Sequence, residues 1–463
     1  MINKIRLQPC PGSFRDPSNQ VYILKDRVLR KIIEKDKKKY LDFFNSNFYK
    51  KISERIVYTE IDNSISNKYI LQNNNDLFFS HEKINFISYP FEWPFFLYKK
   101  AAIFHLELLI DCLENNYILS DSSPYNIQFN KGLEPKFIDF GSFIPYELNS
   151  PWLGYKQFCE QFLSPLLIEN YSKLNFQKLI KNNLEGIDLI STSKILPKKT
   201  FLNYKIFANI HFHSYLINKI DSKSDQKNKN LKFKKENIIS LLKSLKDLIS
   251  SLKSFKKSYW GGYKSEDSYS NEGQSEKENI LANYIQNSKP NNILDLGCNN
   301  GKFSEIALKN GANFVVGTDN DFGSLEKSCL LAQQKNLNFL PLYMDLTEPT
   351  PNIGFQNLER ESFLKRSEIF DGLIAFALIH HLCLSKNIPL KKVILFILSL
   401  ANSGIIEFVP IEDPQCNNLM FNKKVKHEDY NLENFELILK NNTKTFKKLE
   451  LPNSLRVLYI YEI

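Results

Sequence analysis

The chain has 463 residues, of which 43% are hydrophobic and 24% are charged, and its formal net charge is +10. These values are typical of a folded globular protein, and they exclude collagen-like, disordered and disulfide-scaffold classes. The length exceeds what one hydrophobic core usually serves, so two or three domains are expected. The excess lysines are spread along the chain with a concentration in 221–257, which favours a solvated basic surface and disfavours a nucleic-acid groove.

Seven cysteines occur, an odd number, and no two of them have CxxC spacing. This pattern is typical of free thiols in a reducing compartment and argues against disulfides and a zinc site. The beginning of the chain, MINKIRLQPCPGSF, lacks an apolar signal region. No apolar run approaches the ~20 residues that cross a bilayer. We therefore expect a cytoplasmic protein without a transmembrane segment.

Composition divides the chain into three segments. Residues 1–220 are dense in aromatic and apolar residues and predict an α+β domain. Residues 221–257 predict a basic linker followed by an amphipathic helix, because leucines recur there at three- and four-residue spacing. These leucines are Leu241, Leu245, Leu248 and Leu252. Residues 258–463 form the third segment, and its alternating pattern predicts an α/β domain.

The first segment contains Asp121-Ser-Ser-Pro-Tyr-Asn126 and, 13 residues later, Asp139-Phe-Gly, after a predicted helix over 100–115. This pattern resembles the catalytic loop and the DFG segment of protein kinases and related phosphotransferases. The resemblance implies that Asp121 orients a hydroxyl group and that Asn126 and Asp139 hold Mg²⁺ beside ATP. It also implies that residues 87–93, ISYPFEW, form the hinge between two lobes.

The first segment departs from the kinase pattern in two places. Leu119 and Ser120 precede Asp121 where kinases carry His-Arg, and no glycine-rich loop precedes the predicted strand RVLRKI. In that strand, Lys31 is the candidate for the phosphate-binding lysine, and Arg30 is its rival. If the phosphotransfer chemistry is lost, this domain binds a nucleotide, a saccharide or the other domain.

Strand and helix signals alternate along the third segment with short links. Such alternation predicts a parallel, doubly wound sheet, and a C-terminal hairpin around LPNS adds antiparallel pairing at its end. The predicted strands are 292–296, 314–318, 338–344, 371–376 and 405–409, and the predicted helices are 303–310, 325–336 and 390–400.

The first strand of this segment ends in Asp295 and leads into a tight turn between Gly297 and Gly301. Glycine allows the backbone to bend sharply or to approach a ligand closely, and the following helix offers free N–H groups. An acidic residue would repel a pyrophosphate but suits the positively charged end of an amino-acid cofactor. The next two strands end in Asp319 and Asp345, and a carboxylate after the second strand suits two ribose hydroxyls.

This segment resembles the class I S-adenosylmethionine-dependent methyltransferases over roughly 175 residues, and the resemblance implies a Rossmann-like, seven-stranded domain. Cys298 stands where many members carry another small residue. The implied cofactor contacts are Asp295, Gly297, Cys298 and Gly301 around the methionine part, Asp319 and Asn320 at the ribose, and Asp345 and Leu346 near the adenine.

The loops after the fourth and fifth strands should border the methyl-transfer site, because ligands of open α/β sheets lie beyond the carboxyl ends of the strands. Transfer to a hydroxyl group needs a base, and a histidine or a carboxylate can serve. His380 and His381 are the first candidates and Glu407 is the second. A metal site formed from these residues and Asp413 lacks recognisable ligand spacing.

Two other segments are candidates for a lid or a substrate contact. The long connection 354–366 carries the polar candidates Asn357 and Arg360, and long connections are often functional. Trp260, Tyr263 and Tyr269 precede the first strand and could cover the cofactor.

Several sequence motifs of the chain are similar to those of a bacterial group of nodulation-protein-like, two-part methyltransferases. The similarity rests on LDLGCNNGKFS, LYMDLTEPTPNIGFQNLER, AFALIHHL and IIEFVPIEDPQ, and on PGSFRDPSNQVY, FISYPFEW and FCEQFLSPL in the first segment. It implies O-methylation of a hydroxyl-bearing acceptor such as a saccharide. The alternatives are a phosphotransferase–methyltransferase with two active sites, an RNA methyltransferase, and a scaffold that binds the cofactor without turnover.

Overall fold

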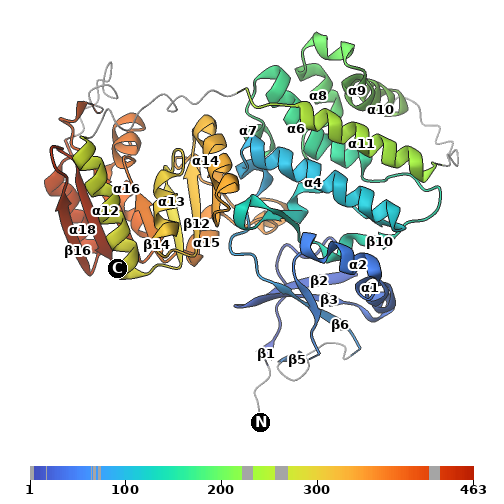
Figure 1. Cartoon of the computed structure of the whole chain (residues 1–463), viewed down its shortest axis with the longest axis horizontal. Helices are drawn as coiled ribbons and strands as arrows, with labels where there is room; N and C mark the ends of the chain where they lie inside the picture. Colours follow the sequence, from blue (N-terminus) through green and yellow to red (C-terminus); the bar gives the residue numbers. More distant parts are fainter. Residues whose placement is uncertain are drawn as a thin grey trace.

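The computed structural model describes residues 5–16, 18–63, 65, 69–70, 75–221, 233–255, 270–414, 416 and 428–463. Figure 1 shows two bodies in contact. The N-terminal body consists of a small sheet with two helices and a larger helical part, and the C-terminal body is built around one large sheet. Among the described residues, no helix has both the length and the apolar content needed to cross a membrane.

The small sheet of the first body is antiparallel, with the strand order β2-β3-β6-β4. Its strand β3 alternates faces, as strands do. Leu29 therefore packs into a small outer cluster, whereas Ile32 joins the main core. The strands and helices of this part are β1 (Ile5–Arg6), β2 (Asn19–Ile23), β3 (Arg27–Ile32), α1 (Lys37–Phe44), α2 (Asn47–Ile52), β4 (Thr59–Ile61), β5 (Tyr69–Ile70) and β6 (Leu77–Glu82).

The helical part is centred on α4 (Phe95–Glu114), the longest helix of the first body, which buries twelve of its side chains. Helix α11 (Lys235–Ser251) packs along α4 and buries Leu242, Leu245 and Ile249. The amphipathic helix predicted after residue 221 therefore lies on the first body. The remaining elements are β7 (Tyr117–Leu119), β8 (Ile127–Phe129), β9 (Pro135–Phe137), β10 (Phe143–Pro145), α5 (Tyr155–Phe158), α6 (Ser164–Leu167), α7 (Phe176–Ile180), α8 (Leu189–Ile195), α9 (Tyr204–Ile206) and α10 (His213–Asp221).

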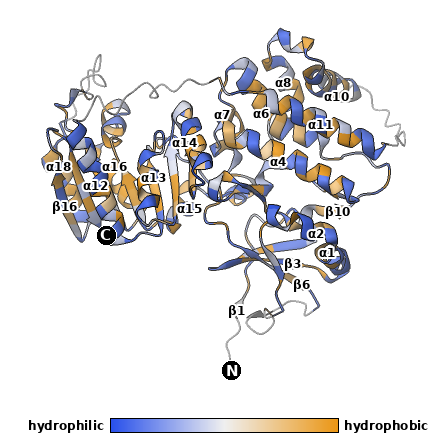
Figure 2. Ribbon diagram, in the orientation of Figure 1, coloured by the Kyte–Doolittle hydropathy of each residue, from blue (hydrophilic) through white to orange (hydrophobic). Residues whose placement is uncertain are grey.

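The C-terminal body confirms the predicted doubly wound α/β fold. Its seven strands have the order β13-β12-β11-β14-β15-β17-β16, in which the first five are parallel and the last two pair antiparallel. Helices lie on both sides of the sheet in Figure 1, and Figure 2 shows strands that are more hydrophobic than these helices. Strands covered on both faces are expected to be apolar.

The elements of this body are α12 (Asn271–Ser288), β11 (Asn292–Leu296), α13 (Lys302–Lys309), β12 (Phe314–Asp319), α14 (Phe322–Gln334), β13 (Phe339–Tyr343), α15 (Phe363–Arg366), β14 (Gly372–Ala375), α16 (Leu390–Leu398), β15 (Ser403–Phe408), α18 (Leu432–Asn442), β16 (Thr445–Glu450) and β17 (Val457–Glu462). Neither α12 nor α18 was predicted from the sequence. The first half of α12 is a polar run without a helical period, whereas α18 carries apolar residues at helical spacing, Leu432, Phe435 and Leu439, so its signal was available in the sequence.

The two bodies are joined by a buried ion pair. Arg366 donates from Nη1 to Oε2 of Glu92 at 3.0 Å, and it donates to the Ile87 carbonyl oxygen at 2.7 Å. The hydroxyl group of Thr350 donates to Oε1 of Glu92 at 2.6 Å. Glu92 is 1% exposed and Arg366 is 7% exposed. The predicted hinge segment 87–93 is therefore also the place where the C-terminal body docks.

Candidate functional site

The turn after β11 has the backbone conformation that its glycines allow. Gly297 and Gly301 have φ values of 74° and 82°, in the left-handed region that favours glycine. A Cβ atom on Gly301 would lie 2.6 Å from the Phe339 ring, so a larger residue would not fit there. The N–H groups of Gly297 and Cys298 donate to the Thr318 carbonyl oxygen and hold the turn against β12.

Asp295 lies at the end of β11 and is 2% exposed. Its Oδ2 accepts a hydrogen bond of 2.6 Å from the Ser304 hydroxyl group at the start of α13. Burial raises the pKa of Asp295 to about 7, because the ionised carboxylate is poorly solvated. A positively charged ligand beside this carboxylate would favour its ionised form.

Asp319 lies at the end of β12, and both of its carboxylate oxygens accept backbone hydrogen bonds. The N–H of Asn299 donates to Oδ2 and the N–H of Asp321 donates to Oδ1, each at 2.8 Å. Burial raises the pKa of Asp319 despite these bonds. The bonds fix the carboxylate beside the glycine turn and leave lone pairs for further donors, such as ribose hydroxyls. Asn320, the neighbouring candidate, is exposed.

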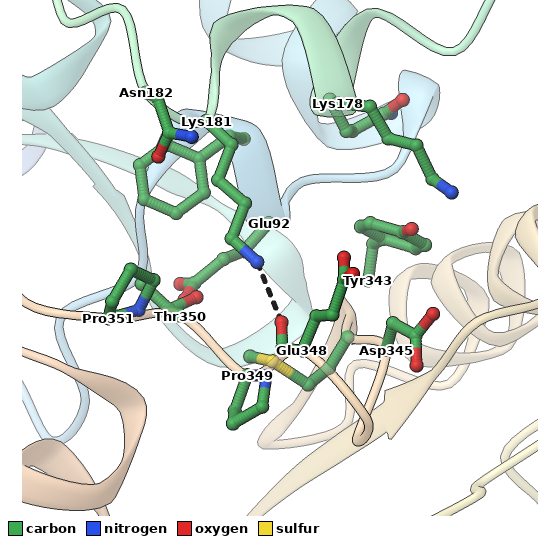
Figure 3. A pocket seen from close by; sticks show the side chains of 13 residues that line it. Glu92, Lys178, Lys181, Asn182, Tyr343, Asp345, Glu348, Pro349, Thr350 and Pro351 are labelled. Atoms are coloured by element: carbon green, nitrogen blue, oxygen red, sulfur yellow. Dashed lines mark hydrogen bonds between the residues drawn. The ribbon is translucent and has the colours of Figure 1, made fainter. Parts of the chain in front are cut away.

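Asp345 follows β13 and lines a cavity of about 340 Å³ between the two bodies. Burial alone would raise its pKa, but hydrogen bonds from the N–H and the hydroxyl of Thr347 lower it below the usual range. Figure 3 shows Lys178 and Lys181 of the first body reaching toward the segment that carries Tyr343 and Asp345. The Lys181 ammonium group donates to the Glu348 carbonyl oxygen at 2.6 Å. Leu346, half-buried, follows in the same segment.

The loop after β14 lies against the glycine turn. An ideal Cβ atom on Gly297 would lie 3.6 Å from Leu378, and the Phe376 ring packs on Phe303 of α13 at 4.7 Å. This loop leads directly into a helical turn that carries His380 and His381, whose ring centroids are 4.2 Å apart. This contact brings the predicted transfer loop to the predicted cofactor turn.

Both histidines are neutral in this environment. Burial lowers the pKa of His381 to about 4, and burial with the neighbouring His381 lowers the pKa of His380 well below its usual value. Within the described part of the chain, Nδ1 of His380 has no hydrogen-bond partner. The lowered pKa keeps each imidazole neutral and also makes it a weaker proton acceptor than an exposed histidine.

Glu407 is placed differently from what the sequence led us to expect. It is 0% exposed, and its Oε2 accepts from the Lys277 ammonium group at 2.7 Å and from the Ala377 N–H at 2.8 Å. Arg456 lies 3.9 Å from its Oε1 and also binds Asp413 at 2.7 Å. A carboxylate held in this way is a poor proton acceptor for a substrate, so Glu407 supports the transfer loop instead.

The connection 354–366 also departs from its predicted place at the transfer site. The Arg360 guanidinium lies 4.5 Å from the centroid of the Tyr125 ring in the first body, and Glu359 accepts a hydrogen bond from Arg15 at 2.8 Å. Asn357 is exposed. The connection therefore docks the two bodies together. Trp260, Tyr263 and Tyr269 lie outside the described residues.

The structure brings together the three residues of the kinase-like pattern. The Asn126 amide donates to both carboxylate oxygens of Asp121, at 3.0 and 3.2 Å. The Ser142 hydroxyl group lies 3.1 Å from Asp121 and also hydrogen-bonds to Asp139. Burial, and then the charge of Asp139, raise the pKa of Asp121 to about 7.

Arg30, rather than Lys31, reaches this acidic group. Its Nη2 lies 2.9 Å from Oδ1 of Asp139, and its Nη1 donates to Asn19 at 2.6 Å. Lys31 points to the opposite face of β3 and lies 3.6 Å from Asp76. The alternation of faces along a strand explains the difference. A divalent cation at Asp139 would have to compete with the Arg30 guanidinium.

One curated relative extends over nearly the whole molecule. The chain is 35% identical over 460 residues to the nodulation protein NoeA of Rhizobium meliloti, in a match that covers 97% of this chain and 95% of that protein. The chain belongs to the NoeA family. No protein-family model matches it.

Solved structures overlap this NoeA-family protein only in part. The match to the bifunctional kinase–methyltransferase WbdD covers 47% of this chain and 46% of that one, with 18% identity and a TM-score of 0.30. An O-methyltransferase from Bacillus cereus in complex with SAH matches over 42% of this chain and 85% of its own, with 11% identity and a TM-score of 0.30. The O-methyltransferase TomG from Streptomyces achromogenes, in complex with SAM, matches over 41% and 79%, with 9% identity and a TM-score of 0.29.

Three residues of this NoeA-family site were not predicted from the sequence. Ser304 follows the glycine turn by three positions, and a hydroxyl group in the first turn of a helix was a signal available in the sequence. Lys277 lies on α12 and Arg456 lies just before β17, in segments that no motif marks, 130 and 49 residues from their partner Glu407. Only the fold brings these two cations to the transfer loop.

Proposed function

We propose that this NoeA-family protein is an S-adenosylmethionine-dependent methyltransferase that methylates a hydroxyl group of an acceptor such as a saccharide. The observation that carries the proposal is the convergence of Asp295, Asp319 and Asp345 around the turn between Gly297 and Gly301 at one edge of the sheet. Ligands of open α/β sheets bind at this edge.

Each acidic residue suits a different part of the cofactor. The buried carboxylate of Asp295 would pair with the ammonium group, and its raised pKa fits a site that is completed by a cation. Asp319 would accept from the ribose hydroxyls, and Asp345 would meet the adenine edge next to the cavity between the bodies. When bound, the cofactor supplies an electrophilic methyl group on its sulfonium.

The chain's own contribution to transfer is to position the acceptor and to accept its proton. His380 and His381 follow the loop that contacts the glycine turn and are the candidate proton acceptors; burial keeps both neutral, and their lowered pKa values make them weak bases. The Lys277–Glu407 ion pair holds the Ala377 N–H and thus fixes the start of this loop. Glu407 acts here as a positioning residue.

The test is a methyl-transfer assay with labelled S-adenosylmethionine against separate saccharide, lipid and RNA fractions. We expect label in a saccharide-containing fraction and none with the Asp319→Ala variant. Label in RNA would replace the acceptor class with nucleic acid. Cofactor binding without transfer to any fraction would indicate the scaffold alternative.

A second candidate function is phosphotransfer by the first body, because Asp121, Asn126 and Asp139 lie within hydrogen-bonding reach of one another or of Ser142. Asn126 and Asp139 would hold Mg²⁺ with ATP, as oxygen ligands do. Magnesium-dependent ATP binding that is lost in Asp139→Asn would support this candidate. The candidate would be contradicted if the unmodified protein and the Asp139→Asn variant bind ATP equally, or if neither binds it.

A further inference from the structure

A continuous row of exposed aromatic rings runs along residues 201–216 of the first body, on the helical turns between α8 and α9, on those between α9 and α10, and on α10 itself. Successive ring centroids in the row lie 6.3, 6.2 and 6.4 Å apart. The rings belong to Phe201, Phe207, Phe212 and Tyr215, which are 49%, 42%, 46% and 56% exposed. Two leucines extend the row: Leu202 is 91% exposed and Leu216 is 39% exposed. We call these six residues the aromatic row.

The aromatic row is not needed for packing within the first body. The opposite sides of the same helices supply the buried contacts, with Ile206 and Ile210 each 0% exposed. His211 hydrogen-bonds to the hydroxyl groups of Ser193 and Thr200, at 2.8 and 2.9 Å, and ties these helices together. A contiguous exposed apolar patch of this kind usually marks an interaction surface.

Lysines predominate among the charged residues of the segment that carries the aromatic row. Residues 189–220 contain five lysines and no aspartate or glutamate. Lys194, Lys198 and Lys199 are exposed beside the row. Lys205 pairs with Asp247 of α11 at 3.7 Å, and the Lys219 ammonium group lies 5.9 Å from the centroid of the Tyr215 ring. The partner of this surface should therefore be both apolar and anionic.

We propose that the aromatic row and its lysines bind the surface of an anionic lipid bilayer. Apolar side chains would enter the boundary between headgroups and acyl chains, where aromatic rings are favoured, and the lysines would meet the anionic headgroups. The two leucines distinguish a bilayer from RNA. RNA would stack on the rings and pair with the lysines but would leave Leu202, the most exposed residue of the row, in water.

The place of the row suits a peripheral contact. Figure 1 shows α8, α9 and α10 at the outer edge of the helical part, opposite the small sheet and away from the C-terminal body. Binding through this edge leaves the carboxyl edge of the seven-stranded sheet to other ligands. The proposal is therefore independent of the methyltransferase proposal.

The test is co-sedimentation of the full chain with vesicles. One vesicle type contains phosphatidylcholine alone, and the other contains phosphatidylcholine and phosphatidylglycerol in equal amounts. We expect binding to the anionic vesicles that weakens with added salt. The double variant Phe201→Ser/Leu202→Ser should reduce this binding on the order of tenfold or more, because it removes two inserting side chains. The variant Lys198→Ala/Lys199→Ala should reduce it about fivefold per lysine.

The matched control is Leu148→Ser/Leu153→Ser, which removes two leucines of the same body that are 80% and 83% exposed but lie in another segment. Binding should be unchanged in this variant. The proposal is overturned if the full chain does not bind anionic vesicles, or if control and row variants lose equal affinity. Two other outcomes also overturn the proposal, each in the absence of vesicle binding. In the first, the row variants lose binding to a single-stranded RNA, which would make the row an RNA-binding surface. In the second, the row variants turn a dimer into a monomer, which would make the row a dimer interface. Circular dichroism establishes that each variant is folded, and the lysine variant tests the surface even if the serine variant unfolds.

Discussion

The two acidic sites of this protein differ in what already lies against their carboxylates. In the C-terminal body, Asp295 and Asp319 accept from neutral donors, namely a serine hydroxyl and backbone N–H groups. Among the described residues, neither of them forms a salt bridge. In the first body, the Arg30 guanidinium lies 2.9 Å from Asp139.

This difference has a direct chemical consequence. Burial raises the pKa of both Asp295 and Asp121 to about 7, so burial alone does not separate the two sites. A cation is favoured beside Asp295, whose hydrogen-bond donor is a neutral hydroxyl group and whose charged neighbours, Asp319 and Lys277, act on it with opposite signs. A metal ion beside Asp139 has to displace or share a charge that the chain itself supplies. Within the described residues, the aspartates of the C-terminal body therefore have no salt bridge that a cationic ligand would have to break. In the first body, Asp139 is already paired with Arg30.

The Arg366–Glu92 pair should hold the two bodies, and with them the two acidic sites, in one cooperative structure, and its removal has the largest expected effect. Arg366→Ala should lower the free energy of unfolding by about 3–5 kcal/mol, because it leaves Glu92 charged, buried and unpaired. Urea titration followed by fluorescence measures the loss. The control is Lys365→Ala, which removes an exposed pair with Glu368 and should leave the free energy of unfolding nearly unchanged. Equal losses in the two variants would show that the interface does not depend on this pair.

The second prediction concerns the ribose contact. Asp319→Ala should weaken S-adenosylmethionine binding roughly 100-fold, since two hydrogen bonds to a charged group contribute about 1.5 kcal/mol or more each. Isothermal titration calorimetry measures the change. Asp319→Asn keeps one acceptor oxygen, so its affinity for S-adenosylmethionine should lie between those of the unmodified protein and the Asp319→Ala variant. An unchanged dissociation constant in Asp319→Ala would remove this residue from the site.

The third prediction follows from the raised pKa of Asp295. Below about pH 7 the buried carboxyl group is mostly protonated in the free protein, and it must ionise to pair with the ammonium group of the cofactor. Affinity should therefore fall up to about tenfold per pH unit as the pH decreases below 7, and level off above it. Calorimetry between about pH 5.5 and 8.5 tests this dependence. Asp295→Asn should bind more weakly at high pH and lose this slope, so an equal slope in the variant would assign the titration to another group.

The smallest expected effect sharpens the contrast between the sites. Asp139→Asn should change the affinity for S-adenosylmethionine by less than about twofold, because Asp139 belongs to the first body and contacts Arg30 there. The same calorimetric titration measures it. A larger change would mean that the two sites are coupled through the interface around Glu92.

The amino-acid pattern alone was enough to predict the alternation of strands and helices in the C-terminal body, the glycine turn and the acidic residues at the strand ends. It also contains the spacing that places Asp121, Asn126 and Asp139 together. These features are local, because side-chain period, turn chemistry and strand ends are set by residues close along the chain. The unpredicted helix α12 shows the limit of such signals, because its first half is a polar run.

Which charged groups are available to a ligand depends on the packing of distant elements against one another. Glu407 lies near the end of a strand, as expected, yet its carboxylate is paired with Lys277 from a helix 130 residues earlier in the chain. The connection 354–366 docks the bodies because Arg366 meets Glu92 across 274 residues. The exposed row at Phe201 and its neighbours arises because helix packing turns these rings outward. The physical reason is common to all three cases: pairing and burial depend on which surfaces meet in space, and local sequence periodicity carries no information about a partner from a distant element.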